Sequence, residues 1–323
     1  MTFEQVLPKF SRTQLTTSIA MMILLAIGSF AQQAPRSTPR AMRFQQEKAM
    51  SIEPVGAGAA AFKQQQARPA AMVSADFDSD GVKDLAVGYG LNKGDEIAIF
   101  HGNLDAIAPQ SKESWLNSGI GRYADAFLPQ ANMIPVPVEP DLLIAMDVNG
   151  DGYIDLVMAA KNGNALYVLA GNGKGQFTLL QLAMVPGTIT ALAAYKPGDN
   201  NSADALIVGV KTGKGYAAEL YRMEHGDFAL RAAYAMPGAV SAIATANLDS
   251  DLTPDAALIA GGQVVVLHGA DALAGSARLE NLPISEAVSL TVGSFLFDRH
   301  AGMQLVVLTS DGTVHFLAHQ GFD

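Results

Sequence analysis

The feature that most constrains this chain is a repeat of about 50 residues that runs through its second part. Five segments share one plan: a short apolar run, an acidic loop, Asp-Leu or a related pair, and further apolar runs. The loops begin at Asp76, Asp147, Lys196, Asn247 and Leu296, at intervals of 71, 49, 51 and 49 residues. A fixed period of about 20–50 residues indicates a fold built from repeated units.

The second repeat shows what one unit contains. Apolar runs at 155–160, 165–170 and 177–183 follow one another, and the turn sequence Gly-Asn-Gly-Lys-Gly separates the last two. With the apolar run before the loop, each unit has four strands, as a propeller blade does. The sequence therefore predicts an all-β propeller of about five four-stranded blades over residues 71–323. The longer first interval predicts an insertion within 103–140.

The acidic loops carry the chemistry. Oxygen-bearing side chains stand at positions 1, 3, 5 and 9, and position 7 can offer its backbone carbonyl. The candidate metal ligands are Asp76, Asp78, Asp80, Val82 and Asp84 in the first loop, Asp147, Asn149, Asp151, Tyr153 and Asp155 in the second, and Asn247, Asp249, Asp251, Thr253 and Asp255 in the fourth. Gly at position 6 of the first two loops permits the sharp turn that lets the ligands converge.

This ligand pattern indicates Ca²⁺, which takes six to eight oxygen ligands. An EF-hand is excluded because position 12 holds Val87 or Met158 where that motif needs Glu. All-oxygen ligands disfavour zinc, and their number disfavours Mg²⁺. Two sites are expected, with a third and weaker one at 247–255, where the Gly is missing. The alternative reading of each loop is a solvated acidic turn.

The loops and the strands after them resemble the FG-GAP/VCBS family of calcium-binding β-propellers, which includes the propeller of integrin α subunits. The resemblance is carried by Asp-Leu-Ala-Val-Gly-Tyr-Gly at 84–90 and by Leu-Ala-Gly-Asn-Gly-Lys-Gly-Gln-Phe at 169–177. It implies a secreted or surface propeller whose calcium loops join the first and second strands of a blade. Family propellers commonly have seven blades, whereas five units are visible here.

The last unit is one strand short. Either a strand before Met72 completes its blade, or the propeller is incomplete.

The N-terminal part has the features of an export signal followed by a linker. Two basic residues precede an apolar run at 19–30, and small residues stand at −3 and −1 of a cleavage site after Ala31. Residues 1–31 are therefore predicted to be a signal peptide, with an uncleaved membrane anchor as the alternative. Residues 32–70 are predicted to be a disordered linker. The expected location is secreted, periplasmic or cell-surface, without a transmembrane span once the signal is cleaved.

Charge and composition restrict the partners. Residues 71–323 carry 13 basic and 28 acidic side chains, so nucleic acid is not expected as a partner. The chain has no Cys, which excludes disulfides and thiolate metal sites. No catalytic motif such as Gly-x-Ser-x-Gly is present, so an enzyme is not expected.

The insertion holds the aromatic residues that could recognise a partner. Trp115, the only Trp, and Tyr123 are candidate ligand contacts, because loops on a rigid scaffold often carry recognition. The alternative is that Trp115 packs in the outer strand of the first blade. The predicted function is a binding or adhesion module for an extracellular protein or glycan. The alternatives are a structural subunit of a surface assembly, or an enzyme acting on polysaccharide.

Overall fold

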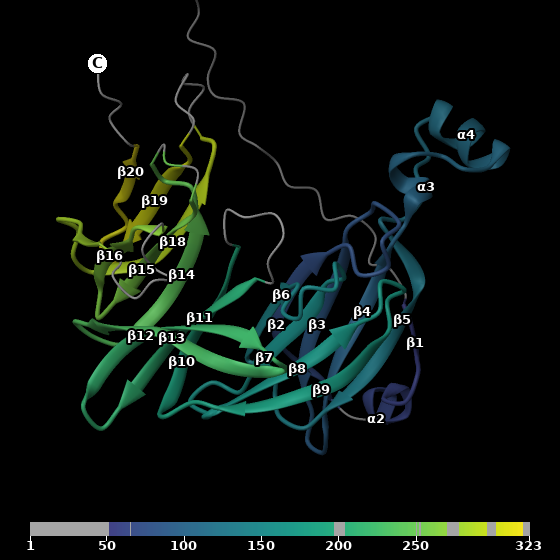
Figure 1. The fold of residues 1–323 in the computed structure, drawn as a ribbon. Coiled ribbons are helices and arrows are strands. Elements are labelled where there is room, and N and C mark those ends of the chain that lie inside the picture. Colours follow the sequence, from purple (N-terminus) through teal and green to yellow (C-terminus); the bar gives the residue numbers. More distant parts are fainter. Residues whose placement is uncertain are drawn as a thin grey trace, which may run out of the picture. The chain divides into compact units, whose positions relative to one another are not determined.

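Five sheets follow one another along the chain in a computed structural model (Figure 1). The structure describes residues 52–64, 66–196, 204–249, 251, 253–269, 278–295 and 302–318. These residues belong to one compact unit, Met50–Asp323. The predicted signal peptide and the first part of the predicted linker lie outside the described residues, as do most of the loops that begin at Lys196 and Leu296.

Apart from β1, each sheet is built from strands that are consecutive in sequence and antiparallel to their neighbours. The first sheet contains β2 (Arg68–Ala75), β3 (Asp84–Gly90), β4 (Asp95–Gly102) and β5 (Phe127–Val136), and the second contains β6 (Leu142–Met146), β7 (Asp155–Ala159), β8 (Ala165–Gly171) and β9 (Phe177–Met184). The third contains β10 (Thr188–Tyr195), β11 (Ala205–Thr212), β12 (Gly215–Glu224) and β13 (Asp227–Met236), and the fourth contains β14 (Val240–Ala246), β15 (Asp255–Ala260), β16 (Gln263–Leu267) and β17 (Leu279–Asn281). The fifth contains β18 (Ala287–Gly293), β19 (Gln304–Thr309) and β20 (Val314–Leu317).

The sheets are the blades of a propeller. The first strands of successive sheets contact one another in the order β2, β6, β10, β14, β18. Four hydrophobic clusters lie between consecutive sheets, so each inner sheet packs on both faces. This packing explains why all side chains of β7 and β15 are buried. The predicted all-β propeller with five repeats is confirmed.

The predicted linker is wrong in its last part. Within the range predicted to be disordered, the chain forms the strand β1 (Glu53–Val55) and the helix α2 (Ala59–Gln64). The strand β2 also begins within it, at Arg68. β1 runs parallel to β5 and forms a fifth strand on the outer edge of the first sheet. Backbone pairing to an existing edge orders β1 although the segment holds few large apolar residues.

The strand before Met72 does not complete the last blade. β1 joins the first sheet, and the fifth sheet has three strands within the described residues. Of the two readings of the short final unit, the structure therefore excludes completion by β1.

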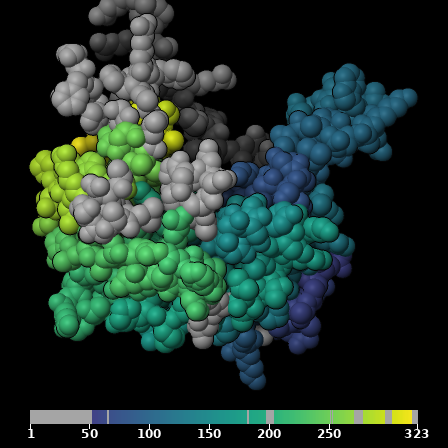
Figure 2. Space-filling view, in the orientation of Figure 1, coloured from purple at the N-terminus to yellow at the C-terminus, as the bar shows by residue number. Residues whose placement is uncertain are grey.

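The insertion in the first blade is helical. Between β4 and β5 the chain forms α3 (Leu104–Ile107) and α4 (Lys112–Gly119), and these stand apart from their own sheet (Figure 2). Asn103 and Ser111 cap the two helices through hydrogen bonds to backbone N–H groups. No helix among the described residues is long and apolar enough to cross a membrane.

Candidate metal centres

The three predicted loops occupy equivalent places in their blades. Residues 76–83 join β2 to β3, residues 147–154 join β6 to β7, and residues 247–254 join β14 to β15. Each loop therefore links the first and second strands of a blade, as the family resemblance implied.

The first loop gathers its acidic side chains at one point. Carboxylate oxygens of Asp76, Asp78 and Asp80 lie within 4.8 Å of one another. Asp76 also accepts hydrogen bonds from the backbone N–H groups of Asp80 (3.2 Å) and Gly81 (3.0 Å). Gly81 has a φ of 87°, a left-handed conformation that favours glycine, so the predicted sharp turn is present.

The second loop has the same fold. Asp147 accepts from the N–H groups of Gly150 (2.7 Å) and Gly152 (2.9 Å), and Asn149 accepts from Asp151 (2.9 Å). Gly152 has a φ of 85°. Positions 1, 3 and 5 of both loops thus supply side-chain oxygens on a tightly turned backbone, a donor set that suits a hard cation.

Position 7 offers its backbone carbonyl in the first two loops. The Val82 side chain is buried, and Tyr153 is partly exposed. Neither side chain is a carboxylate, so the prediction for both residues concerns their carbonyl groups.

Position 9 is a buried structural acceptor in all three loops. Asp84, Asp155 and Asp255 are at most 1% exposed. Each accepts one hydrogen bond from the N–H at position 2 of its loop and one from a Gly at the end of the third strand. The bonds come from Phe77 (2.8 Å) and Gly102 (2.7 Å), from Val148 (3.0 Å) and Gly171 (2.9 Å), and from Leu248 (2.9 Å) and Gly269 (3.0 Å).

These glycines are functional positions that the sequence analysis missed. A Cβ on Gly171 would lie 2.1 Å from the carbonyl oxygen of Ile154, and one on Gly269 would lie 1.7 Å from that of Pro254. Only glycine lets the third strand approach the loop closely enough to reach the position-9 carboxylate. The available signal was the recurrence of Gly at this strand end in three repeats.

Burial disfavours the charged form of the position-9 carboxyls. It raises the pKa of Asp155 to about 6, and it raises the pKa of Asp255. Burial also opposes ionisation of Asp84, but the neighbouring His101 ring and hydrogen bonds from two backbone N–H groups outweigh it and lower the pKa of that carboxyl. The first loop therefore keeps its inner carboxylate charged most readily.

The fourth loop keeps the side-chain acceptors of positions 3 and 5. Asp251 accepts from the Thr253 backbone N–H (2.8 Å) and hydroxyl (2.6 Å), and the hydroxyl bond is the main cause of its lowered pKa. Asp249 accepts from the Asp251 N–H at 3.0 Å. Position 6 holds Leu252, which lies outside the described residues.

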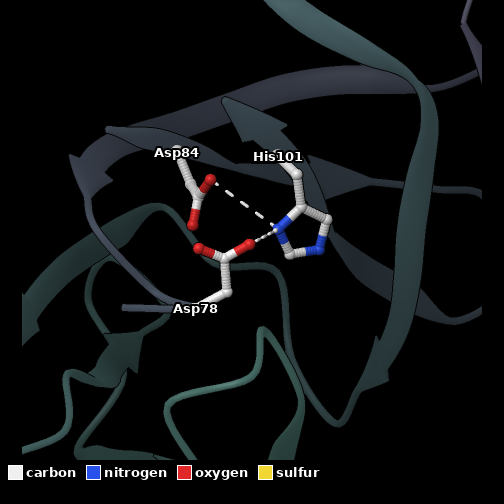
Figure 3. A group of neighbouring side chains, drawn as sticks. All are labelled: Asp78, Asp84 and His101. Carbon is white, nitrogen blue, oxygen red and sulfur yellow. Dashed lines mark ion pairs between the residues drawn. The ribbon is translucent and has the colours of Figure 1, made fainter. Parts of the chain in front are cut away.

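Two histidines enter these loops from the third strand. His101 Nδ1 lies 3.1 Å from an Asp78 oxygen and 3.6 Å from an Asp84 oxygen (Figure 3). His268 Nδ1 lies 3.4 Å from Asp249 and 3.5 Å from Asp255. Each directly precedes the Gly whose N–H donates to the position-9 carboxylate.

The two candidate ligand contacts lie on or beside the helical insertion. Trp115 is on α4 and is 69% exposed, and Tyr123 follows α4 and is 74% exposed. The alternative that Trp115 packs in the outer strand is wrong, because that strand is β5 and begins at Phe127.

The second loop and its blade carry the family signal. Residues 147–208 match the FG-GAP-like repeat. The match runs from position 1 of the second loop into β11, so it covers the last three strands of the second blade and the start of the third. The predicted resemblance is thus confirmed for an FG-GAP-like repeat at these residues. Outside the match, side chains of the first and fourth loops form clusters that could hold a metal ion.

Solved structures with similar chains share little sequence with this one. The BBS1N chain of a complex with ARL6DN is 15% identical (TM-score 0.49), covering 78% of this chain and 66% of that one. A protein from Lactobacillus plantarum is 12% identical (TM-score 0.47; 77% and 70%), and exotype rhamnogalacturonan lyase YesX is 14% identical (TM-score 0.44; 76% and 46%). No curated protein sequence matches the chain.

Proposed function

We propose that this chain is a secreted, calcium-stabilised propeller that binds a protein partner through its helical insertion. The observation that carries the proposal is the set of highly exposed apolar side chains that the insertion holds within a short stretch of sequence. The insertion surface consists of Ile107, Trp115, Leu116, Ile120 and Tyr123, each at least 59% exposed. Exposed apolar side chains that gather in this way are typical of recognition surfaces.

Two of these features favour protein over glycan as the partner. Aliphatic Ile107, Leu116 and Ile120 accompany the aromatic rings, and they offer no hydrogen bonds to sugar hydroxyls. Trp and Tyr are the residues most enriched at protein–protein hot spots.

Calcium is proposed to hold the blades together. The second loop makes a backbone contact to the next blade, because the Asp147 carbonyl accepts from the Asp204 N–H (2.8 Å). A cation that fixes a loop would therefore also fix the junction between two blades. Extracellular calcium modules work at dissociation constants of about 10⁻⁴–10⁻³ M, which agrees with export.

The inner strands support a binding role over glycoside chemistry. β2, β6, β10, β14 and β18 line the propeller axis, and none of them contains Asp or Glu. Glycoside hydrolysis usually needs a pair of such carboxyl groups.

A structural subunit is the second candidate, favoured by the edge strand β20. Val314 is 49% and Phe316 is 61% exposed on this strand. β20 is also the last strand of its sheet in the described part of the chain. An apolar sheet edge can accept a strand from another molecule.

The single Trp gives the test of the binding proposal. Candidate surface proteins and a glycan panel would be titrated against the full chain with millimolar Ca²⁺, and Trp115 emission would be followed. Binding at the insertion surface should shift the emission to the blue. Ile120→Ser and Tyr123→Ser should each weaken binding at least tenfold, whereas Leu180→Ser, which alters a residue 52% exposed on β9, should not.

Three outcomes would count against this function. Protein binding that leaves Trp115 emission unchanged would place the partner elsewhere. If only glycans change the Trp115 emission, the ligand is a glycan and not a protein. Binding abolished by Phe316→Ser and not by Ile120→Ser would favour the subunit role.

A further inference from the structure

The histidine of the fourth blade has the surroundings of a metal ligand. The His268 ring places Nδ1 against two carboxylates, Asp249 and Asp255, at 3.4 and 3.5 Å. Its other nitrogen, Nε2, lies 3.0 Å from a Glu280 oxygen. A carboxylate behind the far nitrogen is the arrangement that orients metal-binding histidines and fixes their tautomer.

A tautomer with the proton on Nε2 would turn the Nδ1 lone pair toward the two aspartates. If Nε2 carries the proton that Glu280 accepts, Nδ1 of the neutral ring is an acceptor. An acceptor nitrogen and two carboxylate oxygens then face one another, which is unfavourable unless a cation lies between them. The alternative is a doubly protonated ring that forms ion pairs with all three acids.

The spacing matches a small dication. Donor atoms bound at about 2.0–2.2 Å in a tetrahedron are roughly 3.4 Å apart, close to the two separations measured here. Ca²⁺ prefers longer bonds and more ligands. The buried Asp255 uses its oxygens for two backbone hydrogen bonds, but a carboxylate has about four lone-pair directions, so one remains for a metal.

A pocket leads to the cluster. It has a volume of about 270 Å³. Asp249, His268 and Glu280 lie in its wall, together with apolar side chains such as Leu282 and Met303. Two of the three ligands, Asp249 and His268, thus line the pocket, while Asp255 lies buried behind them. The pocket leaves room for a fourth ligand, a water or a small molecule, as in zinc sites with an open position.

We propose that Asp249, Asp255 and His268 bind a first-row transition dication of the zinc type, with Glu280 as a positioning residue. This assigns to the fourth loop a different metal from the calcium proposed for the first two. The second loop offers no nitrogen, because Ala170 stands where the His would be, across from Asp155. The inference does not depend on calcium binding by the other loops.

Metal titration of the full chain tests the site. Metal-free protein would be titrated with Co²⁺, a visible reporter for zinc sites, at about pH 7.5 in the presence of millimolar Ca²⁺. The wild type should develop visible absorption that Zn²⁺ removes. His268→Ala and His268→Gln should each bind one equivalent of Co²⁺ fewer than the wild type. Glu280→Gln should bind it at least tenfold more weakly.

The matched control is His225→Asn, which alters an exposed histidine at a turn with a φ of 52°, a conformation that Asn tolerates. It should bind as many equivalents as the wild type. Melting temperatures in chelator would establish that every variant is folded. The proposal is overturned if the wild type and His268→Gln bind equal amounts of Co²⁺, or if millimolar Ca²⁺ abolishes the absorption. Either result would leave His268 as a partner of the three acids without a metal.

Discussion

At the scale of single residues, the position-9 aspartate does more for the fold than a metal ligand alone would. Asp155 is fully buried and accepts hydrogen bonds from the N–H groups of Val148 and Gly171. These bonds connect the loop to the third strand of its blade. Asp151, at position 5, is exposed. The same loop thus contains one structural acid and one whose contribution depends on calcium.

We predict that Asp155→Ala destabilises the chain even without calcium. The substitution leaves two buried N–H groups without an acceptor, which costs about 2–4 kcal/mol. Urea unfolding in excess chelator measures the effect. Asp151→Ala should change stability by less than about 0.5 kcal/mol under the same conditions. Equal effects of the two variants would show that position 9 has no special structural role.

Gly269 gives a second prediction at this scale. Gly269→Ala places a Cβ 1.7 Å from the Pro254 carbonyl oxygen, so the backbone must move and the Asp255 bond to the Gly269 N–H weakens. We expect a loss of about 2–4 kcal/mol in urea unfolding. Gly213→Ala is the control, because nothing lies within 4 Å of its Cβ position. A loss below 0.5 kcal/mol, about the effect of a neutral surface change, would contradict this geometry.

At the scale of elements, the segment before the first blade covers a buried acid. Glu96 on β4 is 2% exposed, and its carboxylate lies directly against Gly58, just before α2. Its Oε2 has no hydrogen-bond partner among the described residues. Burial raises the pKa of this carboxyl.

The pH dependence of Glu96 follows from the direction of that shift. The folded chain holds the Glu96 proton more tightly than the unfolded chain, so stability falls as pH rises from the ordinary Glu pKa through the raised one. We predict that Glu96→Gln stabilises the chain by about 1–3 kcal/mol at pH 7 and that the gain disappears below about pH 4. Urea unfolding at both pH values measures it. A gain that persists unchanged at low pH would mean that charge is not the cause.

The elements also show where sequence reasoning succeeds. The period of about 50 residues and the Asp-rich loops predicted the strands of the second blade almost to the residue, because apolar runs between turns mark buried strands. The helices α3 and α4 were not predicted, since the insertion has no apolar period. β1 was not predicted because its partner, β5, lies more than 70 residues away in sequence. A local sequence pattern does not indicate a pairing over that distance.

The candidate sites also differ in how far the sequence predicts them. Loop positions 1, 3, 5 and 9 follow from spacing along one segment. The approach of His268 to Asp249 and Asp255 depends on the register between β15 and β16, in which Ala256 faces Leu267. That cross-strand contact requires the structure.

At the scale of the whole molecule, the blades are joined by shared hydrophobic clusters and by bonds from loop backbones. Tyr195 of the third blade donates its hydroxyl to the Pro254 carbonyl (2.7 Å), directly before position 9 of the fourth. A loop that loosens therefore affects its own blade and the next. Calcium bound at the first two loops should therefore raise the stability of the whole propeller.

The most direct measurement is the melting temperature of residues 32–323 in about 1 mM Ca²⁺ and in excess chelator. Two sites with dissociation constants of about 10⁻⁴–10⁻³ M should together raise the melting temperature by about 2–10 °C. Asp78→Ala and Asp151→Ala should each remove part of that rise, and Mg²⁺ should not reproduce it. Identical melting temperatures with Ca²⁺ and with chelator would contradict the account and leave the loops as acidic turns.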